Sequence, residues 1–221
     1  MKLIQQSKTY IKKSKKYIYK LLGHTPDRYP LRKGKVDFVF IHINKTAGVS
    51  ITRAIGLPYN RQHLTAKEVI KIIGKEQWEK AYKFTIVRNP WDKVVSHYKY
   101  KIKINQANLK DNPISFSEWV KKTYGIHKDI VYYNNPRWFM PQIDWLLDDK
   151  EELNIDFVGR FENLTTDFQI IADKIGVDSE LPHLNASSSI RPNYKEFYDE
   201  ETKEIVQEFF QKDIEIFQYY F

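Results

Sequence analysis

Residues 36–55 read VDFVFIHINKTAGVSITRAI, and a change of pattern within this stretch decides the fold class. The first eight residues are mostly apolar and rich in β-branched and aromatic side chains, which is typical of a strand buried in a parallel sheet. A turn over residues 44–48 follows, and residues 49–55 then resemble a helix. The stretch therefore predicts a strand, a turn and a helix in succession.

A second stretch repeats this order. Residues 83–87 (KFTIV) predict a strand, Arg88 and Asn89 a turn, and Pro90 the first position of a helix that runs to about residue 104, because proline is favoured there. Two such units predict a parallel sheet flanked by helices in a three-layer α/β domain. Open α/β sheets bind ligands at the carboxyl ends of their strands, so both turns are expected at the site.

The composition narrows the class of protein. The chain has 221 residues, contains no cysteine and shows no internal repeat. Its apolar runs are all shorter than the roughly 20 residues that span a bilayer. One large domain is expected, and disulfides, thiolate metal sites and cysteine nucleophiles are excluded. Because no secretory signal is recognisable, a cytoplasmic location is expected.

The net charge of +8 is unevenly distributed. Residues 1–35 hold eleven of the 36 Lys and Arg residues and only one acid, Asp27, so residues 36–221 carry a net charge of −2. A near-neutral body does not predict a nucleic-acid groove. Residues 36–221 are therefore expected to form the domain, and residues 1–35 a basic amphipathic arm with a linker. Two interpretations of this arm stay open: it contacts an anionic membrane surface or acidic partner, or it packs on its own domain or is half disordered.

Local capping patterns predict the remaining elements. Thr65 and Glu68 form the pattern of a capping box before a helix over residues 65–73, and Ser115 and Glu118 repeat it. Four more elements are expected: a helix around residues 142–147, a strand over 155–158, a helix over 166–175 ended by Gly176, and a final helix over 199–217.

The first turn has the residues of an anion site. Free N–H groups and the positive end of the helix dipole face an anion at such a turn. Lys45 supplies a charge, Thr46 and Ser50 supply hydroxyls, and Gly48 permits close approach of the backbone. A purely structural turn explains the same residues about equally well, and the G-x-x-x-x-G-K-[ST] pattern of nucleoside triphosphatases is absent.

The second turn offers another cation at the same sheet edge. Arg88 ends the strand, Asn89 is a good N-cap, and Ser96 follows two helical turns later. Each residue alone has an ordinary structural explanation. Together, the two turns predict two neighbouring anion sites.

With these two turns, the chain resembles the sulfotransferases that use 3′-phosphoadenosine 5′-phosphosulfate. It resembles in particular the branch of carbohydrate enzymes related to those acting on heparan and chondroitin. The resemblance covers residues 36–221 and implies a P-loop-like parallel sheet flanked by helices. Four stretches carry it: residues 40–50, 84–96, 156–164 and the tail from His183. The chain departs from the family pattern where Asn44 stands in place of a common proline, and at Ala47 and Val49.

The resemblance also implies roles for individual residues. Lys45 would contact the 5′-phosphosulfate and stabilise charge on the bridging oxygen. Arg88 and Ser96 would bind the 3′-phosphate, which remains on the product 3′-phosphoadenosine 5′-phosphate. The remaining donor-binding residues are Thr46, Ala47, Gly48, Val49, Ser50 and Ile51, with Ser188 and Arg191 in a loop that closes over the nucleotide.

Sulfuryl transfer also needs a base, and His63 is our candidate. It lies between the two turns, in a polar loop, and related glycan enzymes place a catalytic histidine in this interval. A surface histidine without a role is the alternative, and His42, His97 and His127 are competitors. No metal is expected, because Lys45, Arg88 and the helix ends supply positive charge.

Residues 132–142 combine aromatic, amide and guanidinium groups, a composition suited to a saccharide acceptor. Arg137, Trp138 and Gln142 are the candidate contacts, and a segment that merely covers the core is equally compatible. The rival functions are a nucleotide or sugar kinase and a non-catalytic protein that binds anionic surfaces through its arm. The oligomeric state is not predicted.

Overall fold

A small parallel sheet forms the centre of the protein. The computed structural model describes residues 31–32, 35–57, 63–181 and 193–221. Within them, strands β3 (Phe38–Ile41), β4 (Tyr82–Val87) and β5 (Phe157–Arg160) are parallel and lie in the order β3-β4-β5. All four β3 residues are buried, as expected for a strand covered on both faces.

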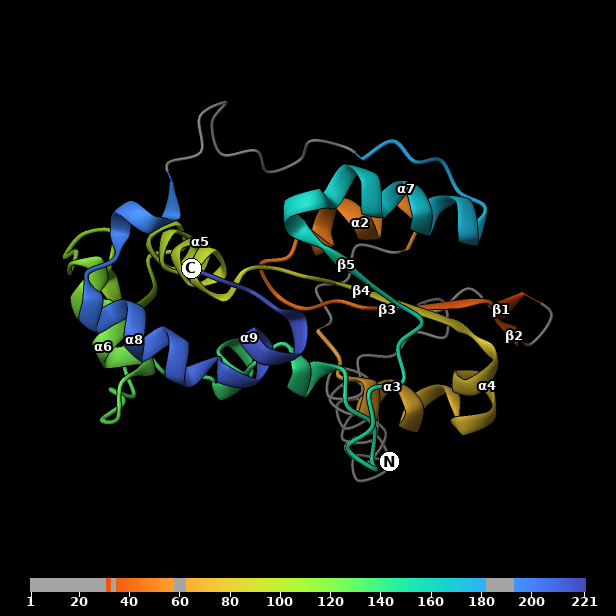
Figure 1. The fold of residues 1–221 in the computed structure, drawn as a ribbon, viewed down its shortest axis with the longest axis horizontal. Helices are drawn as coiled ribbons and strands as arrows, with labels where there is room; N and C mark the ends of the chain where they lie inside the picture. The colour runs from red at the N-terminus through yellow and green to blue at the C-terminus, as the bar shows by residue number, and fades with distance from the viewer. Residues whose placement is uncertain (1–30, 33–34, 58–62, 182–192) are drawn as a thin grey trace, which may run out of the picture.

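Helices cover both faces of this sheet. Figure 1 shows α2 (Gly48–Ala54) and α7 (Leu164–Ile175) on one face, and α3 (Ala66–Ile73) and α4 (Lys75–Lys80) on the other. This arrangement confirms the predicted three-layer α/β class.

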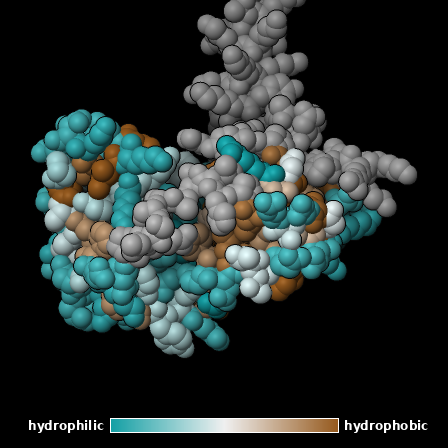
Figure 2. All heavy atoms as spheres, turned by 90° about the horizontal axis from the view of Figure 1, so that it is seen from above, coloured by the Kyte–Doolittle hydropathy of each residue, from teal (hydrophilic) through white to brown (hydrophobic). Residues whose placement is uncertain are grey.

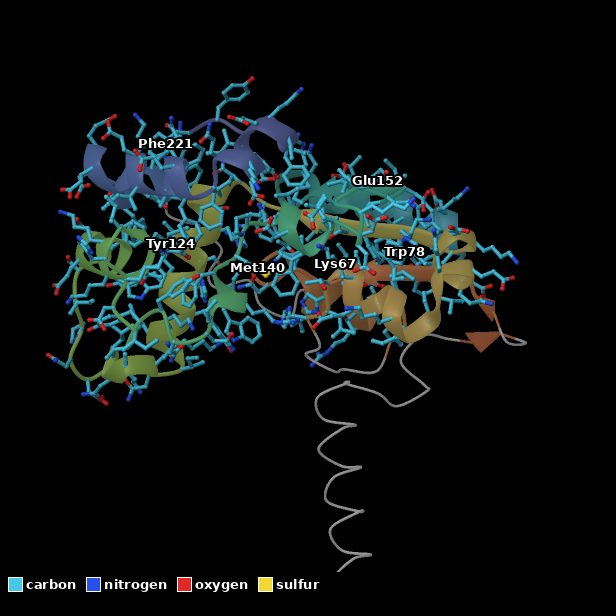
Figure 3. All side chains as sticks on the ribbon, turned by 90° about the horizontal axis from the view of Figure 1, so that it is seen from below. Lys67, Trp78, Tyr124, Met140, Glu152 and Phe221 are labelled. Carbon is cyan, nitrogen blue, oxygen red and sulfur yellow. The ribbon has the colours of Figure 1, made fainter. Side chains whose placement is uncertain are left out.

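A second group of helices lies at the carboxyl ends of the strands, to the left in Figure 1. It contains α5 (Pro90–Lys103), α6 (Phe116–Tyr124) and α8 (Glu200–Phe209), and α9 (Gln211–Phe217) leads back toward the sheet. In Figure 3, Tyr124 lies inside this group and Met140 at its junction with the sheet. Short 3₁₀ turns lie between the longer elements of the chain, at Gln106–Asn108, Pro136–Trp138, Ile143–Trp145, Phe161–Asn163 and Tyr194–Phe197.

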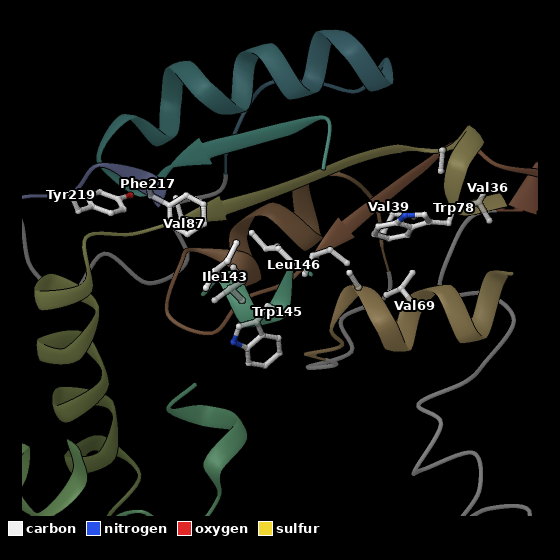
Figure 4. Packing of buried hydrophobic residues seen from close by; sticks show 14 residues of the cluster. Val36, Val39, Val69, Trp78, Val87, Ile143, Trp145, Leu146, Phe217 and Tyr219 are labelled. Atoms are coloured by element: carbon white, nitrogen blue, oxygen red, sulfur yellow. The ribbon is translucent and has the colours of Figure 1, made fainter. Parts of the chain in front are cut away.

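One apolar cluster connects the sheet with α3, α4 and the turn Ile143–Trp145. Val39, Val69 and Trp78 pack at one end of it, and Ile143 and Trp145 extend it toward the carboxyl ends of the strands (Figure 4). On the α2 and α7 side, hydrophilic residues dominate much of the described surface, with apolar groups between them (Figure 2). Within the described ranges, no helix is long and apolar enough to cross a membrane.

Several local predictions are confirmed. The Thr65 side chain and Glu68 form the predicted capping box, and the Ser115 side chain accepts a hydrogen bond from Glu118 N. Asn89 caps α5 with Pro90 in its first turn. Gly176 ends α7 in the left-handed conformation. The prediction of a basic helical arm falls on residues outside the described ranges.

Other predicted boundaries were wrong. The final helix is interrupted at Phe210, which is buried, and the new direction of the chain places Asp213 against the main-chain N–H groups of Gln142 and Ile143. The same contact accompanies a shorter helix near residue 142 than predicted. The third strand begins two residues later than expected; just before it, the Asp156 carboxylate accepts from Lys83 N while Asp156 N donates to Lys83 O.

The structure also extends the folded part toward the N-terminus. β1 (Leu31–Arg32) pairs with β2 (Lys35–Val36) in an antiparallel hairpin. Regular structure thus begins before residue 36, where the sequence placed the start of the domain.

Candidate functional site

The first turn connects β3 to α2 through two residues in the left-handed backbone region. Lys45 has φ 68° and Ala47 has φ 64°, and alternating conformations of this kind turn successive N–H groups toward one concave side. The Thr46 hydroxyl donates to Ile43 O across 2.9 Å, which stabilises the turn. At the start of α2, Ser50 N already donates to Ala47 O at 3.0 Å, whereas the N–H groups of Gly48 and Val49 precede the first hydrogen bonds of the helix. The turn therefore has a backbone geometry that can offer donors to an anion.

Gly48 is required where α2 begins. A Cβ atom at this position would lie 1.9 Å from two ring atoms of His42. The His42 ring, which is nearly buried and stacks on Phe40, thus occupies the space of a side chain at residue 48. His42 therefore packs beneath the turn.

Lys45 is half-buried beside α5. Its Nζ lies 4.3 Å from the centroid of the Tyr100 ring. Burial, together with the neighbouring charges of Arg88 and Lys103, lowers the pKa of Lys45 to about 8. A bound anion would oppose all three effects. The site is therefore rich in positive charge that an anionic ligand can neutralise.

The second turn touches the first directly. Arg88 Nη1 donates to Lys45 O across 3.0 Å, and Arg88 Nε donates to Asp92 at 2.8 Å. The guanidinium also lies over the Phe161 ring, 4.0 Å from its centroid. The prediction that the two turns share one sheet edge is thus confirmed, whereas Phe161 was not foreseen.

Gln142 holds Arg88 in place. Its Oε1 accepts from Arg88 N at 2.9 Å, and its Nε2 donates to Arg88 O at 2.8 Å. Asp213, which is fully buried, accepts in turn from the main-chain N–H of Gln142. Gln142 is itself fully buried, so it fixes Arg88 and does not face an acceptor as we expected from the sequence.

Ser96 lies on the face of α5 that meets the first turn. Ser96 lies four positions after Asp92 and four positions before Tyr100, so the three residues share one side of the helix. Asp92 binds Arg88 and Tyr100 lies under Lys45. The half-buried Ser96 hydroxyl is thus placed between the two cations along the helix.

His63 lies against the end of β3. Its Nδ1 is 2.9 Å from His42 O. A carbonyl oxygen only accepts hydrogen bonds, so Nδ1 carries the proton and the lone pair of the neutral ring is on Nε2. A histidine base needs this tautomer and a fixed ring. Among its competitors, His127 is exposed and His97 is buried.

The predicted acceptor segment packs on His63. The Trp138 ring lies edge-on to the His63 ring, with centroids 4.7 Å apart. Arg137 donates to His63 O at 2.7 Å and pairs with both Glu68 oxygens. Asn44 donates from its side chain to Trp138 O at 2.8 Å, which connects this segment to the first turn. Arg137 thus holds the main chain at His63, and Glu68 does more than cap α3.

The predicted donor contacts at Ser188 and Arg191 lie outside the described residues. In the described part of the chain, no group of three or more His, Asp or Glu side chains is arranged to hold a metal ion. The interaction of Tyr100 with Lys45 could have been suspected from its helical spacing to Ser96. Nothing in the sequence pattern pointed to Asp213.

Comparisons with known proteins bear on this site. A family model described as "Sulfotransferase family" matches residues 31–220. An uncharacterized protein of Archaeoglobus fulgidus is 30% identical over 125 residues, which are 56% of this chain and 90% of that protein. The crystal structure of a sulfotransferase from Alicyclobacillus acidocaldarius matches at 17% identity with a TM-score of 0.34. That match covers 68% of this chain and 56% of the other.

Proposed function

We propose, since the chain belongs to the sulfotransferase family, that it transfers a sulfuryl group from 3′-phosphoadenosine 5′-phosphosulfate to a hydroxyl group of a saccharide. The observation that carries this proposal is the hydrogen bond from Arg88 to Lys45 O, which joins the two cationic turns at one edge of the sheet. A nucleotide with phosphates on both sides of its ribose needs two anion sites this close together.

The donor side of the reaction depends on the two turns. Lys45 and the backbone donors of residues 46–51 would bind the 5′-phosphosulfate. Arg88, held by Gln142 and Asp92, would bind the 3′-phosphate together with Ser96. As the bond between sulfur and the bridging oxygen breaks, Lys45 would neutralise the charge that grows on this oxygen.

The acceptor side depends on His63. Its Nε2 would take the proton from the attacking hydroxyl group as the new oxygen–sulfur bond forms. Two hydrogen bonds that hold His63 in position support this role. The ring Nδ1 donates to His42 O, and the main-chain oxygen of His63 accepts from Arg137. The Trp138 ring beside His63 offers an apolar face on which a sugar ring can stack.

Nucleotide selectivity tests the proposal. We expect 3′-phosphoadenosine 5′-phosphate to stabilise the protein, by roughly 2.7 kcal/mol at a hundredfold excess over its dissociation constant. ADP and AMP, which lack the 3′-phosphate, should stabilise it much less in the same thermal-shift measurement. An equal response to ADP would instead favour the kinase, and sulfuryl transfer to saccharides, followed by mass spectrometry, tests the reaction itself.

A further inference from the structure

The residue before Lys45 joins the donor side of the proposed reaction site to its acceptor side. Asn44 is 3% exposed, and its side-chain Nδ2 donates to Trp138 O at 2.8 Å, although the two residues are 94 positions apart in the chain. The family pattern commonly has proline at position 44, and proline has no side-chain donor for this bond. The contact therefore belongs to this chain in particular.

The other polar atom of the Asn44 side chain is unpaired. Among the described residues, Asn44 Oδ1 is buried and has no hydrogen-bond partner. A buried acceptor without a donor costs free energy, whereas an apolar side chain of similar shape would avoid this cost. Stability alone therefore does not account for an asparagine at this position.

Trp138 extends the contact to the proposed base. The Trp138 ring meets the His63 ring edge-on, with centroids 4.7 Å apart. On another side, the His63 ring lies 4.2 Å from the His42 ring, and His63 Nδ1 donates to His42 O at 2.9 Å. The base is thus held between the end of β3 and a segment that Asn44 binds.

Residues 42–45 therefore act on the base and on the donor together. His42 holds the ring of His63, Asn44 holds Trp138 beside that ring, and Lys45 lies in the proposed donor site. Neighbouring Cα atoms are only about 3.8 Å apart, so a ligand that orders Lys45 also restricts Asn44. Transfer requires the reacting groups to be aligned to within a fraction of an ångström, because small misplacements are costly.

We propose that Asn44 is a positioning residue, which holds the Trp138 segment against His63 when the nucleotide orders the first turn and so aligns the base with the donor. This inference rests on the proposed function, since it concerns the geometry of that reaction. Asn44 would act through Trp138 and would not touch the reacting atoms.

Hydrogen exchange in the turn Pro136–Trp138 tests the proposal. Trp138 N donates to Asn135 O at 3.1 Å, and Phe139 N donates to Pro136 O at 3.0 Å, so exchange of these amides reports opening of the turn. Exchange of peptides covering residues 134–140 is followed by mass spectrometry in the full-length protein, with and without 3′-phosphoadenosine 5′-phosphate. In the wild-type protein, the nucleotide should slow this exchange by about fivefold or more.

Two variants are compared with a matched control. Asn44→Leu replaces the amide by an apolar group of similar size, and Asn44→Ser is too short to reach Trp138 O and serves if leucine prevents folding. The control is Thr85→Val, because the buried Thr85 hydroxyl donates to Ile41 O at 2.8 Å. It therefore loses a side-chain hydrogen bond to the same strand without affecting Trp138.

We expect the Asn44 variants to bind the nucleotide in calorimetric titration but to show no slowing of exchange over residues 134–140. The NMR signal of the His63 ring, assigned with His63→Ala, should likewise shift on nucleotide addition in the wild-type protein and in Thr85→Val, and not in the Asn44 variants. A merely structural role of Asn44 would change stability without removing these responses to the nucleotide.

Three results would overturn the inference. Slowing that persists in the Asn44 variants would assign the ordering to Gln142, which joins Arg88 to the same segment. Equal loss in Thr85→Val would show general loosening of the strand end, and a wild-type protein that binds the nucleotide without slowing would show no alignment. The proposed function survives all three, because nucleotide binding is measured separately. If the wild-type protein does not bind the nucleotide, the proposed function itself fails.

Discussion

Arg88 donates a hydrogen bond to the main-chain oxygen of Lys45 across 3.0 Å, although 43 residues separate them in the chain. The bond holds two strand-to-helix turns at a fixed separation, and each turn contains a cation. A ligand that bridges the turns therefore meets a site that is already assembled. Ordering of the site during binding then costs little entropy.

Replacing Arg88 tests this relationship. Arg88→Lys keeps a positive charge but loses the planar set of donors that reaches Asp92 and Lys45 O together. Charge-assisted hydrogen bonds contribute about 1.5–3 kcal/mol each, so the affinity for 3′-phosphoadenosine 5′-phosphate should fall at least tenfold. Titration calorimetry measures the change, with Lys110→Ala, an exposed site, as the control. Wild-type affinity in Arg88→Lys would exclude a role for the guanidinium.

The pKa of Lys45 predicts how binding depends on pH. It is about 8, below the ordinary 10.5, so charged Lys45 destabilises the free folded protein below pH 8, and this effect disappears as the pH rises toward 10.5. The ligand needs the charged form, so its affinity should decline as the pH rises above about 8. Lys45→Arg should bind with little change between pH 7 and 9, as measured by calorimetry. A similar decline in Lys45→Arg would assign the pH dependence to another group.

Removing His63 should separate catalysis from nucleotide binding. We expect His63→Ala to bind 3′-phosphoadenosine 5′-phosphate normally, because the contacts of His63 with His42 O and the Trp138 ring involve neither Lys45 nor Arg88. Loss of a general base should lower the transfer rate by about two to four powers of ten. His127→Ala, at an exposed position, is the matched control. Near-normal turnover in His63→Ala would remove His63 as the base.

The contact between Gly48 and His42 predicts a coupled pair of substitutions. In Gly48→Ala the new methyl group would meet the His42 ring, and overpacking of this kind typically costs about 1–3 kcal/mol. Adding His42→Ala should recover part of this loss, so the double-mutant cycle should give a stabilising coupling in thermal unfolding. Additive effects would show that α2 shifts away from the ring.

The parts of the site that were predictable depend on neighbours in the sequence. Asn89 caps its own helix, and Lys45 and Gly48 belong to a turn between two recognisable elements. Gln142 was assigned to the acceptor because its segment is polar and aromatic, but its partners are the main-chain atoms of a residue 54 positions away. Asp213 escaped notice for the same reason. Such contacts depend on how the helices pack, and periodicity does not report this packing.

The C-terminal tail offers a last test of how the second turn is held. Asn89 donates from its side chain to Tyr220 O at 2.8 Å, and its N–H donates to Glu162 Oε1 at 2.7 Å. The Tyr219 hydroxyl reaches the other oxygen of Glu162 at 3.1 Å, and the Phe221 ring lies 5.5 Å from Trp91. The tail therefore packs against the residue that follows Arg88.

Deleting Tyr220 and Phe221 should lower the melting temperature and weaken binding of 3′-phosphoadenosine 5′-phosphate several-fold, because Asn89 loses the nearer of two acceptors and Trp91 loses a packing partner. Tyr220→Ala is the matched control: the Tyr220 side chain is 80% exposed, and only its main-chain oxygen contacts Asn89, so this variant should behave like the wild-type protein. Thermal unfolding and calorimetric titration of the three proteins distinguish the cases. If the deletion lowers stability but leaves affinity intact, the tail supports the helices without positioning Arg88.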